Sequence, residues 1–117
     1  MKRVLIIEDC KFTTGTLKEI LKNEGYNVVG HASSGQQGLE LAEDLEPDIV
    51  TVDNMLPDMI GLDVVKQLKE LNDNVKILMI SSVGTEKIIQ ESLQNGASNY
   101  LTKPFSSQQL RDSIGVL

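Results

Sequence analysis

The chain has 117 residues, of which 40% are hydrophobic and 24% charged, and this composition suits one folded domain with one core. A formal net charge of −6, with basic residues mostly scattered singly, argues against direct nucleic-acid binding, which needs a concentrated basic face. No apolar run is long enough to span a membrane, and the N-terminal run is too short for a signal peptide. The single cysteine cannot form an internal disulfide. We therefore expect a cytoplasmic protein without membrane insertion.

Short apolar runs recur along the chain, and three of them are near-continuous and rich in Val, Ile and Leu, which is typical of strands buried on both faces. In chain order, the five expected strands are VLII (4–7), VVGHA (28–32), DIVTV (48–52), KILMI (76–80) and SNYLT (98–102).

The stretch after each run repeats its apolar residues at helical spacing. In chain order, the five expected helices are marked by Leu17, Ile20, Leu21 and Glu24; Leu39, Ala42 and Leu45; Val64, Val65, Leu68 and Leu71; Ile88, Ile89 and Leu93; and Leu110, Ile114 and Leu117. Gly25 and the pair Asn95-Gly96 are expected to end the first and fourth helices.

Strands that alternate with helices predict a parallel sheet with right-handed crossovers. We therefore expect an α/β fold over residues 1–117: an open, doubly wound, five-stranded parallel sheet of order 2-1-3-4-5 with helices on both faces. In such sheets the site lies beyond the carboxyl ends of the strands, where the order reverses. Here that point lies between the first and third strands.

Polar residues stand at the carboxyl ends of these strands. The first ends in Glu8-Asp9, the third in Asp53, the fourth in Ser81 and the fifth in Lys103. Three carboxylates close together repel one another unless a cation lies among them. Oxygen ligands favour a hard cation such as Mg²⁺.

A carboxylate between a divalent cation and an ammonium group is placed to accept a phosphoryl group. Asp53 would be the nucleophile, by the aspartyl-phosphate route. The metal and Lys103 would balance charge on the transferring oxygens, and the Ser81 hydroxyl could hydrogen-bond the new phosphate.

The chain resembles the receiver domain of two-component response regulators, most closely the single-domain receivers of chemotaxis. The resemblance lies in four segments, in order and at these spacings: VLIIED (4–9), VDNMLPDMIG (52–61), ILMISS (77–82) and GASNYLTKPF (96–105). It covers essentially the whole chain and implies a flavodoxin-like fold.

The resemblance also implies a role for each matching residue. Asp53 would be the phosphoacceptor, and Glu8, Asp9, Asp53 and the backbone carbonyl of Met55 would hold Mg²⁺. Ser81 would be the switch hydroxyl, Lys103 would pair with the phosphoryl oxygens and Tyr100 would be the aromatic switch. The Lys103-Pro104 bond would be cis. Met55 stands where such proteins often carry a polar residue.

These roles together imply a phosphorylation-activated signalling switch rather than an enzyme with a separate substrate. A sensor histidine kinase or phosphotransfer protein would donate the phosphoryl group to Asp53, and the domain would assist its own phosphorylation and dephosphorylation. The face made by the fourth helix, fifth strand and fifth helix would then control a downstream effector, and the resemblance implies chemotaxis as one setting. Met1 so close to the first strand slightly favours a natural start.

Three other readings use the same residues differently. A receiver-like interaction module would never be phosphorylated, although the acids, Ser81 and Lys103 argue against it. A flavodoxin-type ligand-binding protein would need a phosphate-binding loop after the first strand, but EDCKFTTGT stands there and its two acids would repel a phosphate. An aspartyl phosphatase would need a second Asp at position 55, which is occupied by Met55. Cys10 is expected as a small buried residue and His31 as a surface residue.

Overall fold

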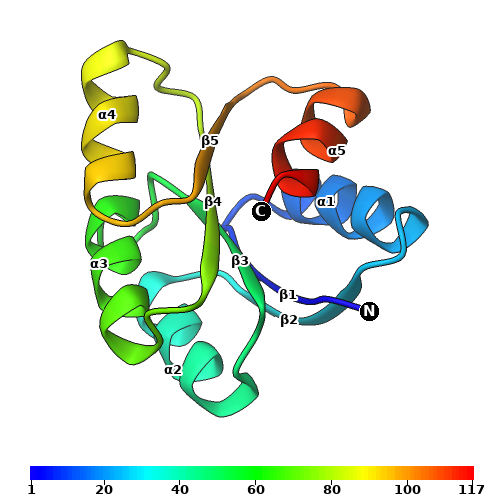
Figure 1. Cartoon of the computed structure of the whole chain (residues 1–117), viewed down its shortest axis with the longest axis horizontal. Helices are drawn as coiled ribbons and strands as arrows, with labels where there is room; N and C mark the ends of the chain where they lie inside the picture. The colour runs from blue at the N-terminus through cyan, green and yellow to red at the C-terminus, as the bar shows by residue number, and fades with distance from the viewer.

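A computed structural model describes residues 1–117 (Figure 1). Strands and helices alternate strictly along the chain. Their bounds are β1 (Arg3–Ile7), α1 (Lys11–Asn23), β2 (Asn27–Ala32), α2 (Gly35–Leu45), β3 (Ile49–Asp53), α3 (Gly61–Leu71), β4 (Lys76–Ser81), α4 (Glu86–Gln94), β5 (Asn99–Thr102) and α5 (Ser107–Gly115). All ten predicted elements are present, with ends that differ by a few residues.

The five strands form one parallel sheet in the order β2-β1-β3-β4-β5, which confirms the predicted topology. The register pairs Ile7 with Val52, Asp53 with Ile80, and Ser81 with Thr102. Neighbouring strands therefore end at nearly the same level, and the residues that follow them meet along one edge of the sheet.

Helices cover both faces of the sheet: α1 and α5 lie on one side, and α2, α3 and α4 on the other (Figure 1). The strands supply both cores because successive side chains point to opposite faces. In β1, Val4 and Ile6 pack with Leu17 of α1 and Leu110 of α5, whereas Leu5 and Ile7 pack on the α2–α3 side. This explains why the strands read as continuous apolar runs.

The predicted helix stops are confirmed, because Gly25 and Gly96 take positive φ angles of 88° and 116° just beyond α1 and α4. Glu24 caps the end of α1, and Leu117 lies beyond α5. No helix has both the length and the apolar character that a bilayer crossing requires.

The loop between β3 and α3 is tied to the start of α2. Asp58 accepts hydrogen bonds from the backbone N–H groups of Gly35, at 2.7 Å, and Gln36, at 2.9 Å. These N–H groups have no partner within the helix, so Asp58 caps α2 from another element. The hydrogen bonds from Gln36 and Gly35 hold the pKa of Asp58 below its usual range.

Candidate functional site

Three carboxylates meet at the carboxyl edge of the sheet. Glu8 and Asp9 follow β1 directly, and Asp53 is the last residue of β3, which pairs with β1. One oxygen from each of the three lies within 4.8 Å of the others. Glu8 is 2% exposed and Asp53 8%, whereas Asp9 is exposed. Two of the three carboxylates are thus buried, and the third faces solvent.

Lys103 reaches this cluster from the end of β5. Its Nζ lies 2.8 Å from Oε1 of Glu8 and 3.6 Å from Oδ2 of Asp53, and these are the only two ion pairs in the structure. Its backbone N–H donates to the carbonyl of Ser81 at 2.8 Å, which holds the β5–α5 loop beside β4. The Lys103-Pro104 peptide bond is cis, as the resemblance implies.

Burial is the main cause of the unusual pKa of Glu8. It raises the pKa of Glu8 to about 7, the adjacent Asp53 carboxylate adds to the rise, and Lys103 opposes it. For Lys103, burial lowers the pKa, but the hydrogen bond and the charge of Glu8, together with the charge of Asp53, outweigh it and leave a net rise. The ammonium group therefore stays charged, and Glu8 resists ionisation without a further cation nearby.

The residues present fit a hard divalent cation. Three carboxylates and one ammonium group leave two uncompensated negative charges when all four are ionised, and the donors are all oxygens. Backbone N–H groups orient two of the acids: Cys10 donates to Oε2 of Glu8 and Met55 to Oδ1 of Asp53, each at 3.2 Å. Met55 itself is 66% exposed.

Ser81 and Tyr100 meet at the backbone of one residue, Val83, in the β4–α4 loop. The Ser81 hydroxyl accepts a hydrogen bond from the Val83 N–H at 3.1 Å. The Tyr100 hydroxyl donates to the Val83 carbonyl, while its half-buried ring packs on the α2–α3 side of the core. The two residues that the resemblance marks as switch residues are thus connected through a single residue.

The structure corrects two expectations from the sequence. His31 is half-buried rather than on the surface, and its Nε2 lies 3.2 Å from the Glu8 carbonyl, where it braces the turn that carries the acids. Cys10 is exposed rather than buried, because the chain leaves the core at the start of α1.

Sequence reasoning also missed the cap that Asp58 provides and the central position of Val83. The acid five residues after Asp53 was a visible signal for the cap, but only the fold shows which helix it reaches.

Comparison with known proteins places these features in a family. A model of the response regulator receiver domain matches residues 4–115. A chemotaxis protein CheY of Thermotoga maritima is 35% identical over 113 residues, which make up 97% of this chain and 94% of that protein.

Solved structures agree. A chain in the crystal structure of the CheX–CheY–BeF3–Mg²⁺ complex from Borrelia burgdorferi superimposes with a TM-score of 0.90 at 29% identity, over 95% of this chain and 87% of that one. A response regulator from Burkholderia pseudomallei, solved with a phosphorylated aspartic acid and a calcium ion, gives a TM-score of 0.87 at 28% identity, over 97% of this chain and 66% of that one.

The family match spans nearly the whole chain, and the match to the Thermotoga protein spans nearly the whole of both chains. This chain therefore belongs to the response regulator receiver domain family.

Proposed function

We propose that this chain is a phosphorylation-dependent switch in which Asp53 accepts a phosphoryl group from the phosphohistidine of a sensor histidine kinase or phosphotransfer protein. The observation that carries the proposal is the position of Asp53. Its carboxylate lies at the end of a central strand, within 4.8 Å of two further acids and 3.6 Å from the Lys103 ammonium group. Family membership supports the phosphorylation-dependent switch in general, and the residue roles are our inference.

In the transfer step, an oxygen of the Asp53 carboxylate attacks phosphorus in line with the departing histidine nitrogen. The new O–P bond forms as the P–N bond breaks, and the electron pair of that bond goes to the imidazole, which takes up a proton. Lys103 would stabilise the charge on the transferring oxygens from its place beside Asp53. A carboxylate nucleophile has no proton to lose, so the step needs no general base.

The same cluster would hold Mg²⁺ through Glu8, Asp9, Asp53 and the backbone carbonyl of Met55. When bound, the ion supplies positive charge that offsets repulsion between the carboxylates and the incoming phosphoryl group. Lys103 now pairs most closely with Glu8. A cation that neutralised Glu8 would free Lys103 to turn toward the phosphoryl oxygens on Asp53.

The conformational change would begin at Ser81. A phosphoryl group on Asp53 offers a charged acceptor to the Ser81 hydroxyl proton, and rotation of the side chain toward it would draw Oγ away from the Val83 N–H that now donates to it. Movement of Val83 would disturb the bond that its carbonyl accepts from Tyr100. The change would thereby pass to β5 and to the face made by α4, β5 and α5, where we place the downstream effector.

Several relatives, including the proteins from Thermotoga maritima and Bacillus subtilis, are named chemotaxis protein CheY. We therefore propose chemotaxis as the signalling setting. We also propose that the protein works in the cytoplasm, and that the domain assists its own phosphorylation and dephosphorylation.

The first experiment is incubation with acetyl phosphate, with and without Mg²⁺, followed by intact-mass measurement. We expect a Mg²⁺-dependent gain of one phosphoryl group in the wild-type chain and none in Asp53→Asn, which keeps the size of the side chain. Lys103→Ala should accept the group much more slowly, although it retains the three carboxylates.

A folded wild-type chain that gains no mass from acetyl phosphate or from a histidine kinase would overturn the proposal. It would favour a receiver-like interaction module that is never phosphorylated.

A further inference from the structure

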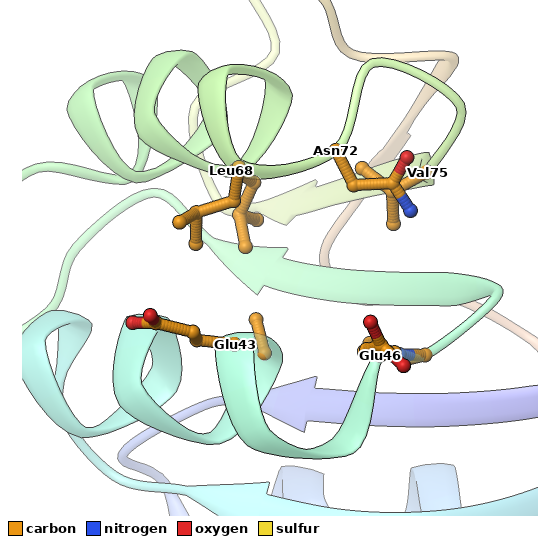
Figure 2. A pocket seen from close by; sticks show the side chains of 8 residues that line it. Glu43, Glu46, Leu68, Asn72 and Val75 are labelled. Atoms are coloured by element: carbon orange, nitrogen blue, oxygen red, sulfur yellow. The ribbon is translucent and has the colours of Figure 1, made fainter.

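A hollow of about 430 Å³ lies between α2 and α3, near their carboxyl-terminal ends. In Figure 2, Leu68 points into this space from α3 and Glu46 points into it from the end of α2. The hollow also includes Pro47 and Val75, which precede β3 and β4. It therefore opens toward the edge of the sheet opposite the carboxylate cluster and is separate from the phosphorylation site.

A second hollow, of about 280 Å³, shares Glu43 and Leu71 with the first and continues it toward the amino-terminal end of α2. We call the two together the α2–α3 groove. On the α2 side the lining runs from Gln36 to Glu46, which is about 15 Å of helix, whereas on α3 it covers only the last turn, from Gln67 to Asn72. Leu71 is its exposed apolar residue, at 48%, above an inner surface that includes Leu39 and Leu68.

Every charged residue that lines the groove is acidic: Glu40, Glu43 and Glu46 from the α2 side, and Glu70 from α3. None of these carboxylates forms an ion pair, since both ion pairs of the structure involve Lys103. Arg3 approaches Glu46 but donates to its backbone carbonyl. The groove thus combines an apolar inner surface with acidic rims that no cation neutralises.

We propose that the α2–α3 groove docks a basic amphipathic helix of a partner protein. Apolar side chains of the helix would cover Leu71 and the inner surface, and its lysines or arginines would face the four rim carboxylates. A helix of about 11 to 14 residues matches the length of the α2 side of the groove. A second copy of this chain fits poorly, because its net charge is −6 and its approach would be repelled.

This surface differs from the α4–β5–α5 face in the proposed function. It would let one receiver contact a basic partner on one side while its phosphorylation-sensitive face stays free. The proposal does not depend on phosphorylation of Asp53, so it can be tested with the unphosphorylated chain.

The probe is a blocked peptide of about 14 residues, with Leu at helical spacing and Lys elsewhere, titrated into ¹⁵N-labelled protein at about 0.15 M salt. We expect saturable amide shifts concentrated in α2 and α3, and none with the same peptide carrying Glu in place of Lys. Glu43→Lys combined with Glu70→Lys should weaken binding by at least about tenfold, and Leu71→Ala should weaken it severalfold.

The matched control is Glu19→Lys combined with Glu24→Lys, which makes the same change in net charge at exposed positions on α1 and just beyond it. It should change the affinity less than about twofold. Outside the substituted positions, the amide spectra of all these variants should match the wild-type spectrum, which checks that they are folded.

Equal weakening by both double variants would mean that the peptide responds only to net charge, and the proposal would fail. Shifts on the α4–β5–α5 face would also overturn it. Concentration-dependent shifts of groove amides without peptide would show that a second copy occupies the groove instead.

Discussion

Replacing Glu8 with glutamine should stabilise the metal-free protein near neutral pH, although it removes one of the proposed metal ligands. Glu8 is almost fully buried next to Asp53, and burial raises its pKa from 4.5 to about 7. Glutamine has nearly the same shape as the protonated acid but carries no charge that must be buried. The Glu8→Gln variant therefore avoids a cost that the wild-type protein bears whenever Glu8 is ionised.

The pKa values set the direction and size of the effect. The pKa of Glu8 is higher in the folded chain than in the unfolded chain, so its stabilising contribution is fully present below about pH 4.5 and is lost as the pH rises through 7. At about 1.4 kcal/mol for each pH unit between the two pKa values, the full loss is about 3 kcal/mol. Roughly 2 kcal/mol of it falls between pH 5 and pH 8.

Urea denaturation in the presence of EDTA measures this directly. We expect the free energy of unfolding of Glu8→Gln to exceed that of the wild type by about 2 kcal/mol more at pH 8 than at pH 5. Added Mg²⁺ should stabilise the wild type at pH 8, by about 2.7 kcal/mol at a hundredfold excess over its dissociation constant. It should stabilise the variant much less. Glu19→Gln, an exposed control on α1, should behave as the wild type in both tests.

A pH-independent difference between Glu8→Gln and wild type would refute the reasoning, because it would mean that ionised Glu8 costs nothing in the folded chain. Equal stabilisation of both proteins by Mg²⁺ would show that Glu8 does not help to hold the ion.

Further predictions concern a tight contact, a cap and the Tyr100 bond. Gly38→Ala should lower the free energy of unfolding by about 1 to 3 kcal/mol, because the new Cβ would lie 2.4 Å from Ile7. Gly15→Ala in open space on α1 should raise it by up to about 1 kcal/mol, and urea titration measures both. Asp58→Ala should lower the melting temperature at pH 7, and this difference should shrink as the pH falls below 3.8 through the lowered pKa of Asp58 in the folded chain. Tyr100→Phe should cost about 1 kcal/mol of stability yet keep the phosphoryl uptake from acetyl phosphate seen by mass.

Much of the fold follows from local patterns in the sequence. Apolar runs such as VLII and DIVTV, separated by helical stretches, indicate strands that are buried on both faces. The strict alternation of strands and helices predicts a parallel sheet, which the structure has. Element ends were less predictable, because caps depend on single residues: Glu24 and Leu117 fit the helical period but lie beyond the helices.

The position of the acidic cluster was also accessible from sequence. Glu8, Asp9 and Asp53 follow runs that must be strands, and parallel strands bring their carboxyl ends to one edge. The environment of each side chain was not accessible. The burial that raises the pKa of Glu8, and the choice of Lys103 to pair with Glu8 more closely than with Asp53, depend on how elements far apart in the chain pack together.

The sequence by itself determined which residues stand at the strand ends, because the strand period and the chain order are local properties. Only the tertiary structure decided that Val83 connects Ser81 to Tyr100, that His31 braces the turn after β1, and that acidic rims face each other across α2 and α3. These contacts join residues whose distance in space has no fixed relation to their separation in sequence. They depend on the shapes and charges of complete elements, which appear only when the two faces of the sheet are covered.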